Sequence, residues 1–198
     1  TIRRGVMFHD GHELTAEDVA YSFWRLLIQD HAAGPSWILL QPFFGLDVKS
    51  FKNDVVDKQY SGNWIQAVEA VQQAITFDNT AGTVTMRLKQ PYGLLIRLLA
   101  GTWGSILNKP WVIQQGDWDG LPATAEKFHD PLAEDDPLFN SMNGTGPYRL
   151  ERWVPGQEIV LVRNPDYWVK TPLWEGGPSG VAQLRQVIIK TVPEWGTR

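Results

Sequence analysis

The sequence predicts a mixed α/β fold, of the α+β kind, in which the strands pair mostly antiparallel. Three observations support this prediction. Residues 15 to about 29 carry apolar side chains at helical spacing, residues 83–89 alternate apolar and polar side chains, and two further strand-like segments flank Pro155 and Gly156. Helices that alternate with hairpins, instead of with single buried strands, favour antiparallel pairing.

Composition places the chain among ordinary globular proteins. Its 198 residues are 43% hydrophobic and 20% charged, and this length is enough to bury roughly 70% of the surface of the unfolded chain. The net charge is −4 without any Lys/Arg cluster, which argues against nucleic acid as a partner. No apolar run approaches the ~18 residues of a membrane span. Cysteine is absent, which excludes disulfides and thiolate metal sites.

A tight turn is predicted near the start of the chain. Asp10 and Gly11 form a short-range reversal signal. His9 and His12 flank them and suggest a metal site as an alternative. A structural metal site needs about four ligands and no further cluster is evident, so the turn is favoured.

The first predicted helix begins directly after this turn. Thr15 is the expected N-cap, and Glu17 and Asp18 place negative charge in the first turn, where the helix dipole favours it. One apolar stripe follows at helical spacing. It consists of Val19, Phe23, Leu26 and Leu27.

The middle of the chain predicts a hairpin and two further helices. Residues 64–77 alternate imperfectly and predict a strand, which pairs with the strand at 83–89. A helix is expected to begin at Pro91 and to end before Gly101. After a loop, a second helix is expected at about 111–115. The acidic, proline-containing residues 117–137 then predict a surface loop.

The segment 142–168 is the most distinctive part of the sequence. Pro155 presets φ and Gly156 accepts positive φ, so the apolar runs on either side of this pair predict a hairpin. Asn-Pro-Asp at 164–166 ends the second strand, because proline cannot donate to the ladder. Residues 187–189 predict another strand, which is expected to be buried.

Three blocks of the sequence, in the same order, are similar to those of one known family. They are RGVMFHDG at 4–11 with LTAEDV at 14–19, TVTMRLKQPY at 83–92, and GTGPY at 144–148 with Trp153 and PGQEIVLVRNPDYW behind it. In this order and spacing the chain resembles the family 5 extracytoplasmic solute-binding proteins of ABC importers. That family includes binders of dipeptides, oligopeptides and nickel.

The resemblance implies a fold and a place within it. Family members are bilobed, with a periplasmic-binding-protein-like type II architecture, and the lobes close on the ligand. The whole chain, 1–198, would be part of the first lobe. About 10–138 would be the smaller subdomain, and about 139–198 the part of the larger subdomain that leads to the hinge. The second lobe would be absent, as would the signal sequence and further strands with which family members begin.

The resemblance also implies a function. The protein would be a substrate-binding component and not an enzyme: it would capture peptides or a similar small solute and deliver it to the permease subunits of an ABC transporter. It would lie in the periplasm or at the cell surface of a bacterium or archaeon, attached to the membrane only through the transporter or a lipid anchor. No cofactor and no metal ion is implied. Peptides, oligosaccharides, opines and metal chelates stay open as ligands.

Seven residues are candidates for contact with the ligand. They are Thr102, Trp103, Gly104 and Ser105, and Gly144, Thr145 and Gly146. The resemblance implies that the first group borders the cleft and that the second lies nearby, and an indole with accessible backbone groups suits such a wall. The alternative for 102–105 is a loop that only joins two helices. For 144–147 a structural role where the strand begins is favoured.

No catalytic set is recognised. Ser105 lacks the second glycine of a nucleophile elbow, and the acidic residues 134–136 are consecutive, whereas the two carboxylates of glycosidases face each other across a cleft. A strand instead of a helix follows Gly144 and Gly146, which excludes a dinucleotide fingerprint. Ten tryptophans leave one alternative function, a Trp-rich carbohydrate-binding or structural module not linked to transport.

Overall fold

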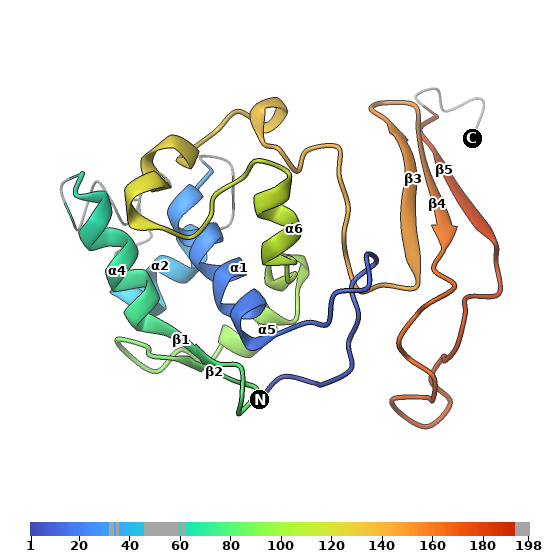
Figure 1. Cartoon of the computed structure of the whole chain (residues 1–198), viewed down its shortest axis with the longest axis horizontal. Helices are drawn as coiled ribbons and strands as arrows, with labels where there is room; N and C mark the ends of the chain where they lie inside the picture. The colour runs from blue at the N-terminus through green and yellow to red at the C-terminus, as the bar shows by residue number, and fades with distance from the viewer. Residues whose placement is uncertain (32–33, 35, 46–59, 61, 193–198) are drawn as a thin grey trace. The chain divides into compact units, whose positions relative to one another are not determined.

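The computed structural model describes residues 1–31, 34, 36–45, 60 and 62–192. The chain divides into two compact units, and each is described by itself. Unit 1 consists of Thr1–Arg3 and Thr15–Phe139, and unit 2 of Arg4–Leu14 and Asn140–Arg198. The assignment of these units to subdomains of a binding lobe remains a prediction. Figure 1 labels the α-helices and strands of both units.

Unit 1 contains mainly helices and one short hairpin. Its elements are α1 (Ala16–Gln29), α2 (Trp37–Phe44), α4 (Trp64–Ala74), β1 (Ile75–Asp78), β2 (Thr83–Met86), α5 (Leu95–Leu99) and α6 (Lys109–Gln114), with the 3-10 turns η1 (Thr102–Gly104), η2 (Pro122–Phe128) and η3 (Ala133–Asp135). The predicted hairpin is confirmed, because β1 and β2 pair antiparallel. Helix α1 lies in the middle of the unit and packs against α4, α6, η2 and both strands (Figure 1).

The predicted helix after Thr15 is confirmed. Thr15 Oγ1 accepts a hydrogen bond from the Asp18 backbone N–H at 3.1 Å, and Asp18 Oδ2 accepts one from the Thr15 N–H at 2.8 Å, which completes a capping box. Phe23 and Leu27 of the predicted apolar stripe are buried. The indole of Trp24 donates to the carbonyl oxygen of Ile75 at 2.8 Å, so the same helix also holds the start of β1.

A second stripe of α1 is polar, although it too is buried. Asp18, Ser22, Arg25 and Gln29 recur at helical spacing and lie on one side of the helix. Asp18, Ser22 and Gln29 are only 1%, 6% and 2% exposed, and the Arg25 side chain is 12% exposed. Buried polar groups need hydrogen-bond partners. The partners come from residues 107–136, and they determine how that part of the chain is held.

Unit 2 is a three-stranded antiparallel sheet with an N-terminal hairpin. Its strands are β3 (Tyr148–Val154), β4 (Glu158–Arg163) and β5 (Gln186–Lys190), in that order across the sheet. The predicted turn at Pro155 and Gly156 is confirmed, with Gly156 at φ +73°. The turn at Asp10 and Gly11 is confirmed as well, because the residues that flank it, Met7 and Glu13, form an antiparallel bridge.

The prediction of a strand over 64–77 is wrong for most of its length. Residues up to Ala74 form α4, and only β1 is extended. Ala67, Val68 and Val71 are fully buried at helical spacing, and Asn63 caps the helix with its side-chain oxygen. The apolar residues of 64–74 recur at helical spacing, and over a short segment this spacing resembles the alternation of a strand.

The residues 117–137 form only in part the surface loop that their composition predicts. They form η2 and η3, and Trp118 and Ala125 within them are fully buried in the core. The indole N–H of Trp118 donates to the carbonyl oxygen of Leu121 at 2.9 Å, which satisfies the polar atom of this buried ring. Charged and proline residues dominate the segment, yet two of its apolar side chains enter the core.

Two element limits and one burial prediction also differ. The helix expected to begin at Pro91 begins at Leu95, and the helix expected at 111–115 begins at Lys109. Strand β5 forms at the predicted place, but Ile188 and Ile189 are 51% and 52% exposed, so the prediction of a buried strand is wrong. An apolar run indicates a strand, whereas its burial depends on what packs against it.

The capping box gives the first testable prediction. Thr15→Ala removes one cap bond and should lower the free energy of unfolding by about 1 kcal/mol. Asp18→Ala should cost more, about 3 kcal/mol, because it leaves the backbone N–H groups of Thr15 and Lys109 without their acceptor. Urea unfolding followed by tryptophan fluorescence measures both. Glu69→Ala, at an exposed position of α4, is the control, and an Asp18→Ala midpoint equal to that control would contradict the assignment.

Candidate functional site

The predicted segment 102–105 is a turn closed by its own backbone. The Gly104 N–H donates to the carbonyl oxygen of Gly101 at 3.0 Å. The N–H and the hydroxyl of Ser105 both donate to the carbonyl oxygen of Thr102, at 3.2 and 2.6 Å. The segment joins α5 to the stretch before α6, as the sequence predicts (Figure 1).

The polar stripe of α1 fixes the chain directly after this turn. Ser22 Oγ accepts a hydrogen bond from the Leu107 N–H at 2.8 Å, and Asp18 Oδ1 accepts one from the Lys109 N–H at 2.9 Å. Lys109 Nζ also lies 2.6 Å from Glu17 Oε1. The side chain that caps α1 therefore also holds the chain at the start of α6.

Trp103 lies half-exposed beside a small apolar cavity. The cavity, of about 10 Å³, is lined in part by Phe23, Leu26, Leu39, Leu98 and Leu99. The indole is 49% exposed, and Leu94 and Ile96 at the start of α5 are 55% and 75% exposed. Residues 98–108 include no charged side chain. The exposed apolar side chains and the indole are suited to pack against an apolar or aromatic group.

Gly104 is required by a close approach of two backbone segments. A Cβ atom at this position would lie 2.7 Å from the carbonyl carbon of Leu99 and 3.0 Å from its Cα. No side chain fits without moving the end of α5. The glycine therefore lets the turn fold back on the helix and sets the position of the neighbouring Trp103.

The motif at 144–146 joins three segments of unit 2. The His9 N–H donates to the Gly144 carbonyl oxygen at 2.9 Å, and the Gly144 N–H donates to His9 Nδ1 at 3.2 Å. His9 Nε2 lies 3.1 Å from the carbonyl oxygen of Gly146, and the indole N–H of Trp168 donates to that of Thr145 at 2.8 Å. All three carbonyl oxygens are thus engaged by groups of the same unit.

His9 makes these contacts as a neutral ring. Burial lowers the pKa of His9, and the charge of Arg149 acts in the same direction, while the bond to Gly146 and the charge of Asp10 oppose them. With the proton on Nε2, the ring donates to Gly146 and accepts from the Gly144 N–H, which satisfies both contacts.

Asn143 precedes the motif and was missed by sequence reasoning. It is 8% exposed, and its amide nitrogen donates to Asp10 Oδ2 at 2.8 Å. Among the described residues, its Oδ1 is the buried side-chain atom that has no hydrogen-bond partner. The N–H and hydroxyl of Thr145 form no hydrogen bond with other described residues either. The Asn143 oxygen is buried, whereas Thr145 is partly exposed.

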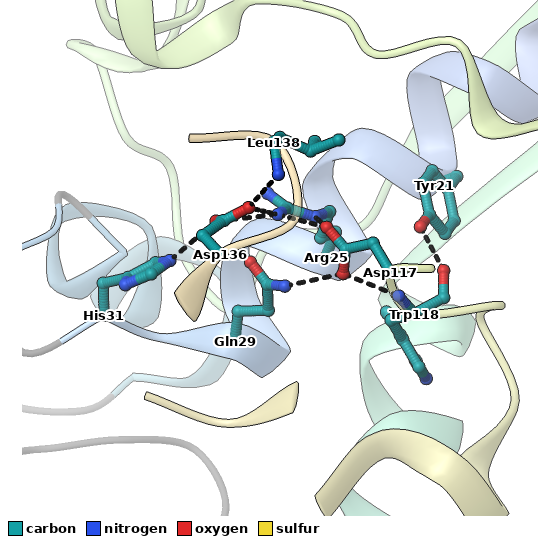
Figure 2. A network of polar contacts seen from close by, with 8 residues as sticks. All are labelled: Tyr21, Arg25, Gln29, His31, Asp117, Trp118, Asp136 and Leu138. Atoms are coloured by element: carbon teal, nitrogen blue, oxygen red, sulfur yellow. Dashed lines mark hydrogen bonds and ion pairs between the residues drawn. The ribbon is translucent and has the colours of Figure 1, made fainter. Parts of the chain in front are cut away.

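A charge cluster at the end of the polar stripe was also missed. Figure 2 shows the guanidinium of Arg25 between two carboxylates: Nη2 lies 2.5 Å from Asp117 Oδ2 and 3.0 Å from Asp136 Oδ2. Gln29 Nε2 donates to the other oxygen of Asp117 at 2.9 Å, and His31 Nε2 lies 3.4 Å from Asp136 Oδ2. Its sequence signal is weak, because a polar stripe on an amphipathic helix normally indicates a solvent-facing side.

The cluster shifts the protonation of two of its members. Burial alone would raise the pKa of Asp136, but the contacts from His31, the Leu138 N–H and Arg25 outweigh it and lower this pKa to about 2. The bond to Asp136 raises the pKa of His31 above its ordinary value, although burial opposes the change. The two side chains therefore favour each other's charged form.

Other features of the described residues point to no further chemistry. A cavity of about 690 Å³ lies against α6 and η2, with Ile113, Asp119, Thr124 and Phe128 among its lining residues and none of the seven candidates. No group of three or more histidine, aspartate or glutamate side chains is placed to hold a metal in the described part of the chain. In that same part, none of the helices combines the length and the apolar character that crossing a membrane requires.

The comparison with known proteins decides the family. A family model described as bacterial extracellular solute-binding proteins, family 5 Middle, matches residues 1–198. The chain belongs to this family. It is 27% identical over 198 residues to the probable D,D-dipeptide-binding periplasmic protein DdpA of Escherichia coli (strain K12), covering 100% of this chain and 27% of the relative. It is 26% identical over 167 residues to the periplasmic oligopeptide-binding protein OppA of Salmonella typhimurium, covering 84% and 25%.

Solved structures confirm the fold class predicted for this family 5 chain. Listeria monocytogenes OppA bound to peptide matches with a TM-score of 0.58 at 21% identity, over 99% of this chain and 31% of that protein. DppA from Helicobacter pylori in complex with the peptide STSA matches with a TM-score of 0.55 at 24% identity, over 99% and 31%. The mixed α/β architecture with antiparallel sheets is that of periplasmic binding proteins. The chain spans about a quarter to a third of the length of these relatives.

Gly104 gives the second prediction. Gly104→Ala should lower the free energy of unfolding by about 1–3 kcal/mol, because the new methyl group collides with the backbone of Leu99. Gly93→Ala is the matched control, since a Cβ there meets nothing within 4 Å. Thermal unfolding of both variants measures the difference. Equal transition temperatures would show that the turn moves freely and does not fix Trp103.

Proposed function

We propose that this chain is part of the extracytoplasmic substrate-binding component of an ABC importer, which captures peptides or a similar small solute and delivers it to a membrane permease. The observation that carries the proposal is the match of a solute-binding family along all 198 residues. The names of the relatives support peptides as the ligand class: DdpA is named for D,D-dipeptides, and OppA for oligopeptides. No observation favours a Trp-rich carbohydrate-binding module.

The proposal assigns partners and a location to the whole protein, of which this chain supplies one part. The partners are the ligand and the permease subunits of an ABC transporter, and the protein binds and releases its solute without converting it. The relatives DdpA and SapA are named as periplasmic proteins, which supports the periplasm or the cell surface as the location. Attachment to the membrane would then occur through the transporter or a lipid anchor.

Within the chain, we assign ligand contact to Trp103, with Thr102, Gly104 and Ser105 holding its position. Three observations support the assignment. The indole is half-exposed beside an apolar cavity, its turn is closed by internal hydrogen bonds, and the polar stripe of α1 fixes the chain that follows. A rigid, half-exposed aromatic ring offers contact area at little entropic cost.

For Gly144, Thr145 and Gly146 we propose mainly a joining role in unit 2. Their carbonyl oxygens are engaged by His9 and Trp168, which leaves the N–H groups of Thr145 and Gly146 and the Thr145 hydroxyl as the groups able to contact a ligand. This motif therefore contributes less to ligand binding than Trp103 does.

One observation favours a second ligand class. The binding protein AgaA from A. tumefacien R10, in complex with agropinic acid, matches with a TM-score of 0.53 at 20% identity, over 99% of this chain and 28% of that protein. Agropinic acid is an opine and not a peptide. Opines therefore belong in any ligand screen beside peptides.

A thermal-shift screen of the full-length protein tests the proposed function. Dipeptides, oligopeptides, opines and nickel chelates are compared, and each hit is confirmed by calorimetry. A ligand at one hundred times its Kd should stabilise the protein by about 2.7 kcal/mol and raise the transition temperature visibly. No response to any class would count against a transport receptor.

The role of Trp103 gives the third prediction. Trp103→Ala in the full-length protein should weaken binding of the best ligand roughly tenfold, about 1.4 kcal/mol, because a half-buried ring leaves the wall. Trp174→Ala is the control, since this indole is 62% exposed in unit 2 and outside the proposed site. Calorimetry measures both variants. Unchanged affinity in Trp103→Ala would remove this residue from the site while leaving the transport function untouched.

A further inference from the structure

The charge cluster around Arg25 holds both ends of one segment against α1. Asp117 lies three residues after the end of α6, and Asp136 lies directly after η3. Arg25 contacts both carboxylates. A single guanidinium therefore closes a loop of the chain that contains η2 and η3. Phe139, three residues after Asp136, is the last residue of unit 1.

The two ends of this loop are held by different chemistry. The Asp117 side chain is fully buried, and it accepts hydrogen bonds from Gln29 Nε2 at 2.9 Å and from the Trp118 N–H at 2.6 Å. Gln29 and the backbone do not titrate. Asp136 instead contacts His31, whose side chain is 33% exposed and can exchange protons with water. The Asp136 end therefore has a titratable histidine partner that the Asp117 end lacks.

Protonated His31 balances the charges of the cluster. Asp117 and Asp136 carry two negative charges against the one positive charge of Arg25, which stays protonated at all relevant pH values. Other groups that face His31 are the carbonyl oxygen of Pro131, which favours its proton, and Arg25, which opposes it. Asp30, next to His31 on the same helix end, accepts a hydrogen bond from the Ser36 hydroxyl.

We propose that His31 and Asp136 form a proton-operated latch, which fastens the chain to unit 1 at the point where it leaves for unit 2. With His31 charged, the latch is closed and residues 132–139 are held on α1. With His31 neutral, Asp136 loses the charged imidazole and keeps Arg25 and the Leu138 N–H as partners. This end of the loop then opens more often, while the Asp117 end stays fixed. The latch would regulate how firmly the connection between the units is anchored.

The direction of the pH effect follows from linkage. Protonated His31 stabilises the closed latch fully below the ordinary histidine pKa of 6.5, and this stabilisation is lost as the pH rises through the raised value in the folded protein. Asp136 contributes above its ordinary pKa of 3.8, and its contribution is lost as the pH falls toward about 2. The latch is thus held most firmly between about pH 4 and about pH 6.5.

Amide hydrogen exchange of the full-length protein between about pH 5.5 and about pH 8.5, corrected for the intrinsic rate, tests the latch. Protection of residues 132–139 should fall with rising pH, by roughly tenfold for each unit by which folding raises the pKa of His31. The amide of Leu138 is a direct reporter, because it donates to Asp136 Oδ1 at 2.8 Å. Residues 117–121 are the internal reference and should keep their protection.

Variants separate the latch from general loosening. His31→Gln keeps an N–H donor but cannot take the charge, so the pH step should disappear and protection should stay at the high-pH level. Asp136→Asn should lower protection at every pH. His12→Gln, in unit 2, is the matched histidine control and should keep the step.

Three results would overturn the latch. The first is a pH-dependent fall in the protection of residues 132–139 that persists in His31→Gln. The second is the absence of this fall in the unchanged protein, and the third is an equal loss of protection at residues 117–121. The physiological meaning, that an extracytoplasmic receptor senses the pH around it, rests on the proposed function. The exchange result does not, so a failed ligand screen and a failed latch are distinguishable.

Discussion

The polar stripe buried along α1 is the constraint on which unit 1 depends. An unpaired buried polar group costs about 1–3 kcal/mol, so every member of the stripe must find a partner. Asp18 and Ser22 find theirs in the backbone before and at the start of α6, and Arg25 finds carboxylates on either side of η2 and η3. Segments far apart in the sequence are thus arranged along a single helix. The turn that carries Trp103 gains its fixed position from the same stripe.

The sequence predicted the elements of the fold better than their surroundings. The helix after Thr15 and the turn at Gly156 follow from local signals, a cap with an apolar stripe and a residue that accepts positive φ. The strand expected over 64–77 failed because a short apolar pattern fits two periods. The prediction of a surface loop at 117–137 was incomplete for another reason. Its composition is polar, and only tertiary packing reveals that Trp118 enters the core.

The candidate site shows the same division. Motif order identified the family, because the motifs consist of residues close together in the sequence. The role of Trp103 in ligand contact stays a prediction. The contact between His9 and the motif at 144–146 was not predictable, because it joins residues more than a hundred positions apart. Nor was the pairing of Arg25 with Asp136, for the same reason. Polar stripes on helices are normally read as solvent-facing, and only the structure shows that this one is buried.

Because one guanidinium pins both ends of the loop from Asp117 to Asp136, the geometry of those ends is independent of how much chain lies between them. Loop-closure entropy grows slowly with length, so extra residues there cost little. Leu132, 65% exposed, marks a point on this loop that faces solvent. A peptide tag or a small fluorescent domain inserted beside it would extend into solvent and leave both ends of the loop in place. This loop is therefore a practical place to attach a reporter.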